Sequence, residues 1–320
     1  MSFFDPENPV KVSGMLLVDK PAGPTSHDIV HRVRKLTGID KVGHGGTLDP
    51  MASGLLPLLV GEATKMSSFI LADDKSYEFD LTLGATTDTD DSTGVVVSTS
   101  SVPEDLSSSR LRAITRDFEG ERLQQPPMYS AVKQQGVPLY KLARKGVTVP
   151  RESRRIEIYS LELLAVEPPV LTFRVHCSKG TYIRVLAREI GEALSTGAHL
   201  SRLRRLSVGT FSLGEATALA VMEKEWKAPD FTRNLLGPDR VFDALPGVRL
   251  LGEASTRLLK GALLPATAIF RREGLFHMKD MIRILGQDGK IRAIAEALRE
   301  GESLGDFPLG IPFARVSLVF

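Results

Sequence analysis

The spacing of apolar positions predicts helices and strands in the first part of the chain. Tyr77, Phe79, Leu81 and Leu83 alternate with polar residues, which predicts a half-buried strand over Ser76–Leu83. Short apolar runs predict further strands at Ser13–Lys20, Leu55–Val60, Ile156–Val166, Leu171–Cys177 and Leu203–Leu213. Apolar residues at helical spacing predict helices from Thr25 or Ser26 to Gly38, and over Ala63–Leu71, Glu104–Phe118 and Thr181–Leu194. Polar residues fill Gly84–Gly94, which we expect to be a loop. Helices mixed with strands that are not neighbours in the sequence favour an α+β fold.

The end of the chain has a pattern of its own. Short strands are predicted at Val248–Leu251, Ala268–Arg271, Met281–Gly286 and Lys290–Ala295, with a helix over Glu253–Lys260 that Gly261 ends. Residues 214–240 are expected to be a helical or irregular linker. The chain of 320 residues is therefore expected to form two domains, 1–240 and 241–320, in line with about 150 residues per domain.

Composition excludes several classes of protein. One cysteine, Cys177, excludes an internal disulfide and a cysteine-rich zinc site. No apolar run approaches the ~20 residues that a membrane span needs. The N-terminus has no basic stretch followed by an apolar one, so the sequence predicts no secretory signal. We therefore expect a cytoplasmic protein that makes no membrane contact.

Positive charge is concentrated in two zones, although the net charge is only +2. Residues 122–155 contain eight basic residues and one acid, Glu152, and residues 179–205 contain six basic residues and two acids. Such zones on a near-neutral protein are typical of a polyanion-binding surface. A solvated charged face is the alternative for either zone. Four prolines and two glycines within 124–150 indicate an excursion from the core.

The segment Val42–Gly54, VGHGGTLDPMASG, places one carboxylate between a glycine-rich turn and a proline. Gly43, Gly45 and Gly46 allow a ligand to approach the backbone closely. Pro50 prevents the chain from continuing as a strand interior. A loop of this kind suits a rigidly held reactive carboxylate, Asp49, but a tight surface turn is an equally ordinary use of these residues.

Two further residues are candidates for the same site. Tyr77 opens an alternating strand, so its ring is either a stacking platform or part of the core. Arg184 lies in the first turn of a predicted helix, where a cation opposes the helix dipole, and a carboxylate partner or solvent exposure would account for it. A metal site is not indicated, because the pair His27 and His31 lacks further ligands of a known pattern.

The chain resembles the bacterial TruB-type tRNA pseudouridine synthases, which convert the T-loop uridine at tRNA position 55. The similarity covers about Gly14 to Phe211 and is carried by ordered motifs: GMLLVDKPAGPTSHDIVHRVRK (14–35), KVGHGGTLDPMASGLLPLLVGEATK (41–65), KSYEFDLTLGATTDTDDSTG (75–94), QQPPMYSAVKQQGVPLYKLARKG (124–146), CSKGTYIRVLAREIG (177–191) and GAHLSRLRRLSVG (197–209). Six motifs in the right order make a specific signal. The tail resembles, more weakly, a small RNA-binding PUA domain.

The resemblance implies a pseudouridine-synthase fold, with a mixed and largely antiparallel central sheet flanked by helices, and a β-rich PUA-like C-terminal domain. It implies that Asp49 is the catalytic carboxylate, that Tyr77 stacks on the target base and serves proton abstraction from C5, and that Arg184 pairs with Asp49 and holds it ionised. The same resemblance gives roles in the pocket or in RNA contact to Leu203, His44 and Lys20. Residues near 124–152 match a mobile thumb, in which we expect RNA contacts from Lys133, Lys141, Arg144 and Lys145.

The implied reaction exchanges the N1–C1′ bond of uridine for a C5–C1′ bond, so it requires no cofactor. The implied partner is the T-arm of tRNA, with no obligate protein partner and a monomer as the expected state. Two alternatives belong to other classes. A non-catalytic RNA-binding or RNA-folding protein would need the basic zones and the tail but not Asp49. A nucleoside hydrolase or glycosidase would normally need a second carboxylate.

Overall fold

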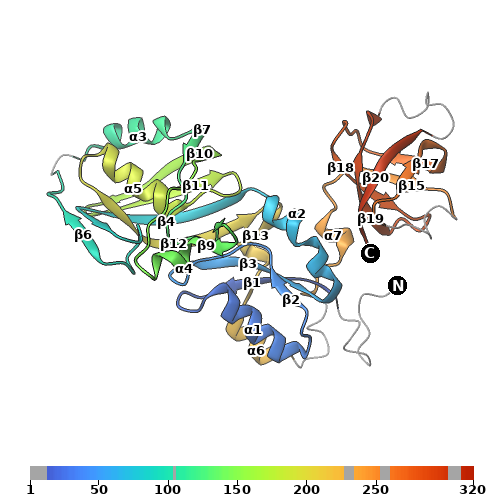
Figure 1. The fold of residues 1–320 in the computed structure, drawn as a ribbon, viewed down its shortest axis with the longest axis horizontal. Coiled ribbons are helices and arrows are strands. Elements are labelled where there is room, and N and C mark those ends of the chain that lie inside the picture. Colours follow the sequence, from blue (N-terminus) through green and yellow to red (C-terminus); the bar gives the residue numbers. More distant parts are fainter. Residues whose placement is uncertain (1–12, 104–105, 227–233, 253–259, 302–310) are drawn as a thin grey trace.

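The computed structural model describes residues 13–103, 106–226, 234–252, 260–301 and 311–320. Two sheets dominate it (Figure 1). The first has ten strands, in the order β14-β1-β3-β12-β4-β11-β10-β7, with β2 added to β3 and β13 added to β12. Two of its pairings, β1–β14 and β3–β12, are parallel and the others are antiparallel. The predicted mixed, largely antiparallel sheet is confirmed.

The first sheet is built from strands whose burial follows the apolar pattern. In β4 (Lys75–Leu83), odd-numbered residues are buried and even-numbered residues are half-buried, as alternation predicts. The remaining strands are β1 (Gly14–Lys20), β2 (Val42–His44), β3 (Ser53–Val60), β7 (Gly120–Gln124), β10 (Arg154–Glu167), β11 (Val170–Cys177), β12 (Ala198–Val208), β13 (Phe211–Ser212) and β14 (Thr217–Ala218). Two small hairpins stand apart: β5 (Ala85–Thr87) with β6 (Val96–Thr99), and β8 (Lys133–Gln134) with β9 (Val137–Pro138).

Helices cover the first sheet. Helices α1 (Ser26–Thr37), α3 (Ser108–Asp117), α5 (Ile183–Ala193) and α6 (Leu219–Glu225) share one apolar cluster with the sheet strands. Thr25 caps α1 by a reciprocal capping box with Asp28, and Gly38 ends it in the left-handed region. Helix α4 (Leu139–Ala143) lies within the predicted thumb.

The second sheet contains six strands in the order β16-β20-β19-β18-β15-β17. They are β15 (Gly247–Leu250), β16 (Leu263–Pro265), β17 (Ile269–Glu273), β18 (Met281–Leu285), β19 (Ile291–Ala297) and β20 (Pro312–Val319). The β-rich C-terminal part is thereby confirmed. The predicted helix Glu253–Lys260 falls on residues 253–259, outside the described residues.

An apolar cluster joins the two sheets. It combines Met15 and Leu17 of β1 with Ile294 and Leu318 of the second sheet. Helices α2 (Ser67–Ala72) and α7 (Pro238–Val241) lie between the sheets in Figure 1, where the rings of Phe69 and Phe242 meet edge to face with centroids 5.3 Å apart.

Four element predictions need correction. The helix expected over Ala63–Leu71 is a 3-10 helix, Gly61–Met66, followed by α2; the Thr64 hydroxyl donates to the Gly61 carbonyl at 2.8 Å, which favours the tighter turn. The strand expected at Leu203–Leu213 begins at Ala198 and breaks at Gly209, whose φ is 53°. The helix expected from Glu104 begins at Ser108. The polar loop 84–94 instead begins with β5.

Candidate active site

Asp49 lies on the loop that connects β2 to β3, eight residues from Gly45 to Ala52. The backbone N–H of Ala52 donates to the Asp49 carbonyl at 3.1 Å and closes a turn around Pro50. Two glycines around this turn have left-handed backbone angles, with φ of 142° at Gly46 and 103° at Gly54. A side chain at Gly54 would place Cβ 2.3 Å from a carbonyl oxygen of β12, so this position needs glycine.

Two polar side chains hold the middle of this loop. The Ser26 hydroxyl, in the first turn of α1, donates to the Leu48 carbonyl at 2.9 Å and accepts from the Leu48 N–H at 2.8 Å. The Lys20 ammonium, at the end of β1, donates to the carbonyls of Ala52 at 2.6 Å and Pro50 at 3.4 Å. Lys20 is fully buried and thus braces the turn directly after Asp49.

A second buried cation, Arg205, holds both ends of the loop. The Arg205 guanidinium, on β12, donates to the Leu55 carbonyl at 2.7 Å, to the Gly46 carbonyl at 3.1 Å and to the Thr47 carbonyl at 3.4 Å. The path of the loop is therefore set by side chains from three other elements. Buried backbone carbonyls need such partners.

Arg184, in the first turn of α5, forms the expected pair with Asp49. Its Nε lies 2.9 Å from Asp49 Oδ2, and its second carboxylate neighbour is Asp91, with Nη1 at 3.7 Å from Oδ2. Its other donors reach the backbone carbonyls of Thr89 at 3.1 Å and Tyr129 at 2.7 Å. The two carboxylates account for a cation at a helix N-terminus, and the side chain is 5% exposed, which overturns the solvent-exposed alternative.

Asp91 is itself held in a fixed orientation. The hydroxyls of Thr89 and Thr93 donate to its Oδ1 at 2.8 and 2.6 Å, and the Thr93 N–H donates at 2.9 Å. At the start of α5, the Gln124 amide accepts from the Tyr182 N–H at 2.8 Å and donates to its carbonyl at 3.1 Å. Arg184 thus projects from a helix end whose position is fixed by the neighbouring strand β7.

Burial dominates the electrostatics of the loop. Burial raises the pKa of the Asp49 carboxyl above its usual range, while Arg184 and Lys20 offset part of this effect. Pairing with Arg184 therefore works in the direction we expected, but burial outweighs it. Burial also lowers the pKa of Lys20 to about 8, although Asp49 opposes the change. The site combines an anion and a cation that are both costly to keep charged.

The other expected pocket residues surround the loop. Tyr77 is 8% exposed and pairs with Arg205 across the β4–β12 ladder, and burial raises the pKa of its hydroxyl above its usual value. Leu203 is buried on β12 opposite Phe79 of β4, in the same apolar cluster as Tyr77. His44 ends β2, and its Nδ1 accepts from the Gly46 N–H at 3.4 Å. Burial lowers the pKa of His44, so its imidazole is neutral at pH 7.

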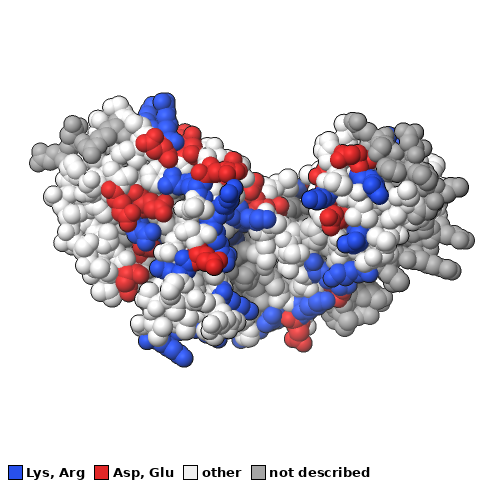
Figure 2. Space-filling model, turned by 45° about the horizontal axis from the view of Figure 1, so that its top comes forward, with Lys and Arg blue, Asp and Glu red and all other residues white. Residues whose placement is uncertain are grey.

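The predicted thumb residues lie on the insertion that carries β8, β9 and α4. Lys133, Lys141, Arg144 and Lys145 are all exposed, and within the described ranges none of them forms an ion pair with a carboxylate. A cavity of about 200 Å³ separates this insertion from the Asp88 loop and is lined by Asp88, Met128, Tyr129, Ala143, Gly146, Val147 and Thr148. Figure 2 shows the surface hollowed between the parts that carry the two sheets, with lysine and arginine side chains on both sides.

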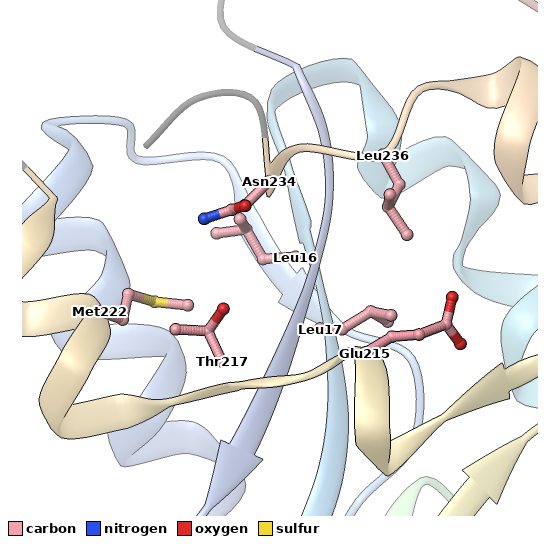
Figure 3. Close-up of a pocket in the computed structure, with 7 residues that line it drawn as sticks. All are labelled: Leu16, Leu17, Glu215, Thr217, Met222, Asn234 and Leu236. Atoms are coloured by element: carbon pink, nitrogen blue, oxygen red, sulfur yellow. The ribbon is translucent and has the colours of Figure 1, made fainter. Parts of the chain in front are cut away.

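A second cavity, of about 150 Å³, lies beside β1 and β14 and contains none of the expected site residues (Figure 3). Its lining combines Leu16, Leu17, Glu215, Thr217, Met222, Asn234 and Leu236. Among the described residues, no three His, Cys, Asp or Glu side chains gather in a way that could hold a metal ion. No described helix is long and apolar enough to span a membrane.

Sequence reasoning missed two residues of the site. Asp91 was predicted only as part of the polar loop Gly84–Gly94, and its role depends on Arg184, which is distant in the sequence. Arg205 was counted as one of six charges in a basic zone. A signal for Arg205 was available, because strand alternation places it on the same face as Leu203 and opposite to Arg204.

Comparisons with known proteins identify the family. Residues 34–183 match the family model for the TruB family pseudouridylate synthase, N-terminal domain, and residues 184–238 match the tRNA pseudouridylate synthase B C-terminal domain. The tRNA pseudouridine synthase B of Syntrophotalea carbinolica is 44% identical over 301 residues, which are 93% of this chain and 97% of that protein. The protein of the same name from Dechloromonas aromatica is 47% identical over 251 residues, 78% of this chain and 83% of that protein.

Comparison with solved structures supports the same family. The chain is similar to one in a Cbf5–Nop10–Gar1 complex, with a TM-score of 0.76 and 30% identity, covering 99% of this chain and 88% of the other. It is also similar to a chain in an H/ACA RNP bound to a substrate RNA containing 2′-deoxyuridine, with a TM-score of 0.75 and 28% identity, covering 96% and 84%. The matches to the family models and to the relatives agree with the Asp49 loop and the buried Arg184. The chain therefore belongs to the TruB family of pseudouridylate synthases.

Proposed function

We propose that the protein isomerises the T-loop uridine at position 55 of tRNA to pseudouridine, with Asp49 as the catalytic carboxylate. The names of the relatives in S. carbinolica and D. aromatica support tRNA as the substrate class. The observation that carries the assignment of Asp49 is its 2.9 Å ion pair with the buried Arg184, on a loop bonded to three other elements.

The geometry suits a reaction at the ribose or the base. Arg184 engages Oδ2 of Asp49, and 34% of the Asp49 side chain is exposed, so the carboxylate remains accessible to a ligand. The reaction breaks N1–C1′ and joins C5 to C1′; C5 loses its proton and N1 takes one up, so the product is an isomer of uridine. An ionised Asp49 can attack C1′ or C6, or remove the 2′ proton, and each of these routes requires a fixed carboxylate.

Tyr77 is best suited to stacking on the target base. Its pKa lies above the usual value of a phenol, so it keeps its proton at neutral pH and is a poor base for the C5 proton. Stacking is worth about 1–3 kcal/mol per base, which offsets part of the cost of taking a uridine out of its stack. Because Tyr77 as a whole residue is 8% exposed, stacking requires that more of its ring become accessible to the base.

Binding of the T-arm fits the exposed cations and a neutral histidine. Phosphate contacts from Lys133, Lys141, Arg144 and Lys145 would give much of the affinity and a steep salt dependence. The Nδ1 of His44 accepts a hydrogen bond within the loop, so Nε2 carries the ring proton and can donate to an RNA oxygen. The resemblance of the C-terminal part to a PUA domain supports a further RNA contact there.

The decisive experiment removes only the charge of Asp49. Asp49→Asn should abolish tritium release from C5-labelled tRNA while the affinity for tRNA stays within about threefold, because a carboxamide is neither base nor nucleophile. Full activity of this variant would refute the catalytic assignment. Mapping pseudouridine in the product, with a tRNA that carries cytidine at position 55 as the control, tests the position.

A further inference from the structure

Arg205 is a buried charge whose partners are almost all backbone atoms. Its side chain is 1% exposed, and among the described residues no carboxylate forms an ion pair with it. Its neighbour Arg204 pairs with Asp19 at 2.8 Å on the other face of β12. Burying a cation without a carboxylate partner costs free energy. We therefore expect the hydrogen bonds of Arg205 to have a role that an apolar residue at this position could not fill.

These hydrogen bonds converge on the Asp49 loop from one planar group. Nη2 and Nη1 donate to the carbonyls of Gly46 and Thr47, which precede Asp49, and Nε donates to the carbonyl of Leu55, which follows it. One rigid guanidinium therefore fixes the distance between the two ends of the loop. The fork of five donors in a fixed plane makes this possible, and the ammonium of lysine lacks this geometry.

Arg205 also connects the loop to the aromatic residue of the site. Tyr77 pairs with Arg205 across the β4–β12 ladder, and the guanidinium lies close enough to the phenol for the two groups to interact electrostatically. Glycine is required where the loop crosses this arginine: a Cβ at Gly54 would lie 2.3 Å from the Arg205 carbonyl oxygen, and Gly46, beside the guanidinium, has a φ of 142° that other residues rarely adopt. Loop, ring and arginine are packed as one unit.

We propose that Arg205 is a positioning residue for the isomerisation, which sets the Asp49 carboxylate against the Tyr77 ring without contacting the substrate. This inference rests on the proposed function, since it takes Asp49 and Tyr77 as the reacting and stacking groups. Its physical basis is that small misplacements are costly: a shift of ~1 Å in a reacting group can cost about 100-fold in rate.

The test compares Arg205→Met, which has a similar length and no charge, with Arg205→Lys and with a matched control on the same strand. Val208→Ala is the control, because Val208 is fully buried on β12 but belongs to the apolar cluster between the two sheets. Single-turnover tritium release, tRNA affinity and melting temperature are measured for each full-length variant.

We expect Arg205→Met to lower the single-turnover rate by about 100-fold while tRNA affinity changes by less than about threefold. Arg205→Lys should recover part of the rate, because a cation with three donors replaces some of the bonds. Val208→Ala should lower the melting temperature and leave the rate of the folded enzyme unchanged. If Arg205 had a purely structural role, its replacement would change stability without a selective loss of rate.

Two results would overturn the proposal. One is a rate for Arg205→Met close to that of the wild type at a temperature where the variant is folded. The other is a loss of rate in Val208→Ala that matches the loss in the arginine variants. If Arg205→Met does not fold, the comparison of Arg205→Lys with Val208→Ala decides. A wild type that releases no tritium would instead mean that the proposed function has failed.

Discussion

Replacing Arg184 by methionine separates the orientation of Asp49 from the stability of the fold. The change removes the 2.9 Å contact to Asp49 and the 3.7 Å contact to Asp91 without creating a large cavity. A hydrogen bond to a charged group contributes about 1.5–3 kcal/mol. With about 1.4 kcal/mol per factor of ten, we expect the single-turnover rate to fall by about 10- to 100-fold, or more if Asp49 also moves.

The same change leaves the carboxylate of Asp91, which is 6% exposed, without its cation. Breaking a buried pair costs about 3–5 kcal/mol, and the lower end applies because the hydroxyls of Thr89 and Thr93 still bond Asp91. At roughly 2–4 °C per kcal/mol for a chain of this size, about 3 kcal/mol corresponds to a fall of roughly 6–12 °C in melting temperature.

The pH dependence of the rate is a third measurement, and the direction in which it should change follows from the pKa of Asp49. The reaction needs the ionised form of Asp49, whose pKa is raised by burial, so activity is lost as the pH falls through a value above the ordinary pKa of an aspartate. Arg184 lowers this pKa, and its removal must move the acid limb of the rate profile to higher pH. Arg184→Lys keeps the charge and should move the limb less.

Single-turnover tritium release is measured between about pH 5 and 9, with enzyme in excess over tRNA. It gives both the rate and the position of the acid limb of the pH–rate profile. Arg188→Met is the matched control, because Arg188 lies one turn later on α5 and pairs with Asp90 and Glu192 instead. The reasoning is refuted if Arg184→Met and Arg188→Met have the same rate and the same acid limb, for then the ion pair does not organise Asp49.

Three further experiments probe other parts of the site. Gly54→Ala, at a φ of 103° and with Cβ 2.3 Å from the backbone of β12, should lower the melting temperature, and calorimetry that shows no change would contradict the packing described. Tyr77→Phe should keep most of the rate whereas Tyr77→Leu should lower it by roughly 5- to 100-fold, the value of about 1–3 kcal/mol of stacking; equal rates would argue against stacking. Replacing Lys141, Arg144 and Lys145 together by alanine should reduce the salt slope of tRNA binding by about two to three in fluorescence titrations, and an unchanged slope would place these cations in solvent.

The sequence predicted the parts of the fold that rest on local patterns. The alternation in β4 and the cap of α1 are local signals, and both elements are where they were expected. Strand β20 and the hairpin β5–β6 were missed. In the hairpin, Val96–Thr99 is exposed throughout, so its residues show no alternation of burial, and its backbone pairs with β5. Polar loops of this kind carry no periodic signal.

The site was predictable where a residue has an unusual local position. Asp49 stands in a glycine-rich turn and Arg184 at a helix N-terminus, and the family resemblance linked them. The two residues that were missed, Asp91 and Arg205, depend on contacts with chain that is distant in the sequence. Buried arginines that bond backbone carbonyls look like any other basic residue until strand alternation is used to assign their face.

The apolar cluster between the two sheets also bears on how the chain unfolds and how it can evolve. Met15, Leu17 and Leu59 are buried together with Ile294 and Leu318, so parting the sheets would expose all of them to water. The C-terminal part is thus joined to the catalytic part as a common hydrophobic core rather than as a detachable module. Its loss or exchange would require compensating polar substitutions on β1 and β3, the strands that also carry Lys20 and the end of the Asp49 loop.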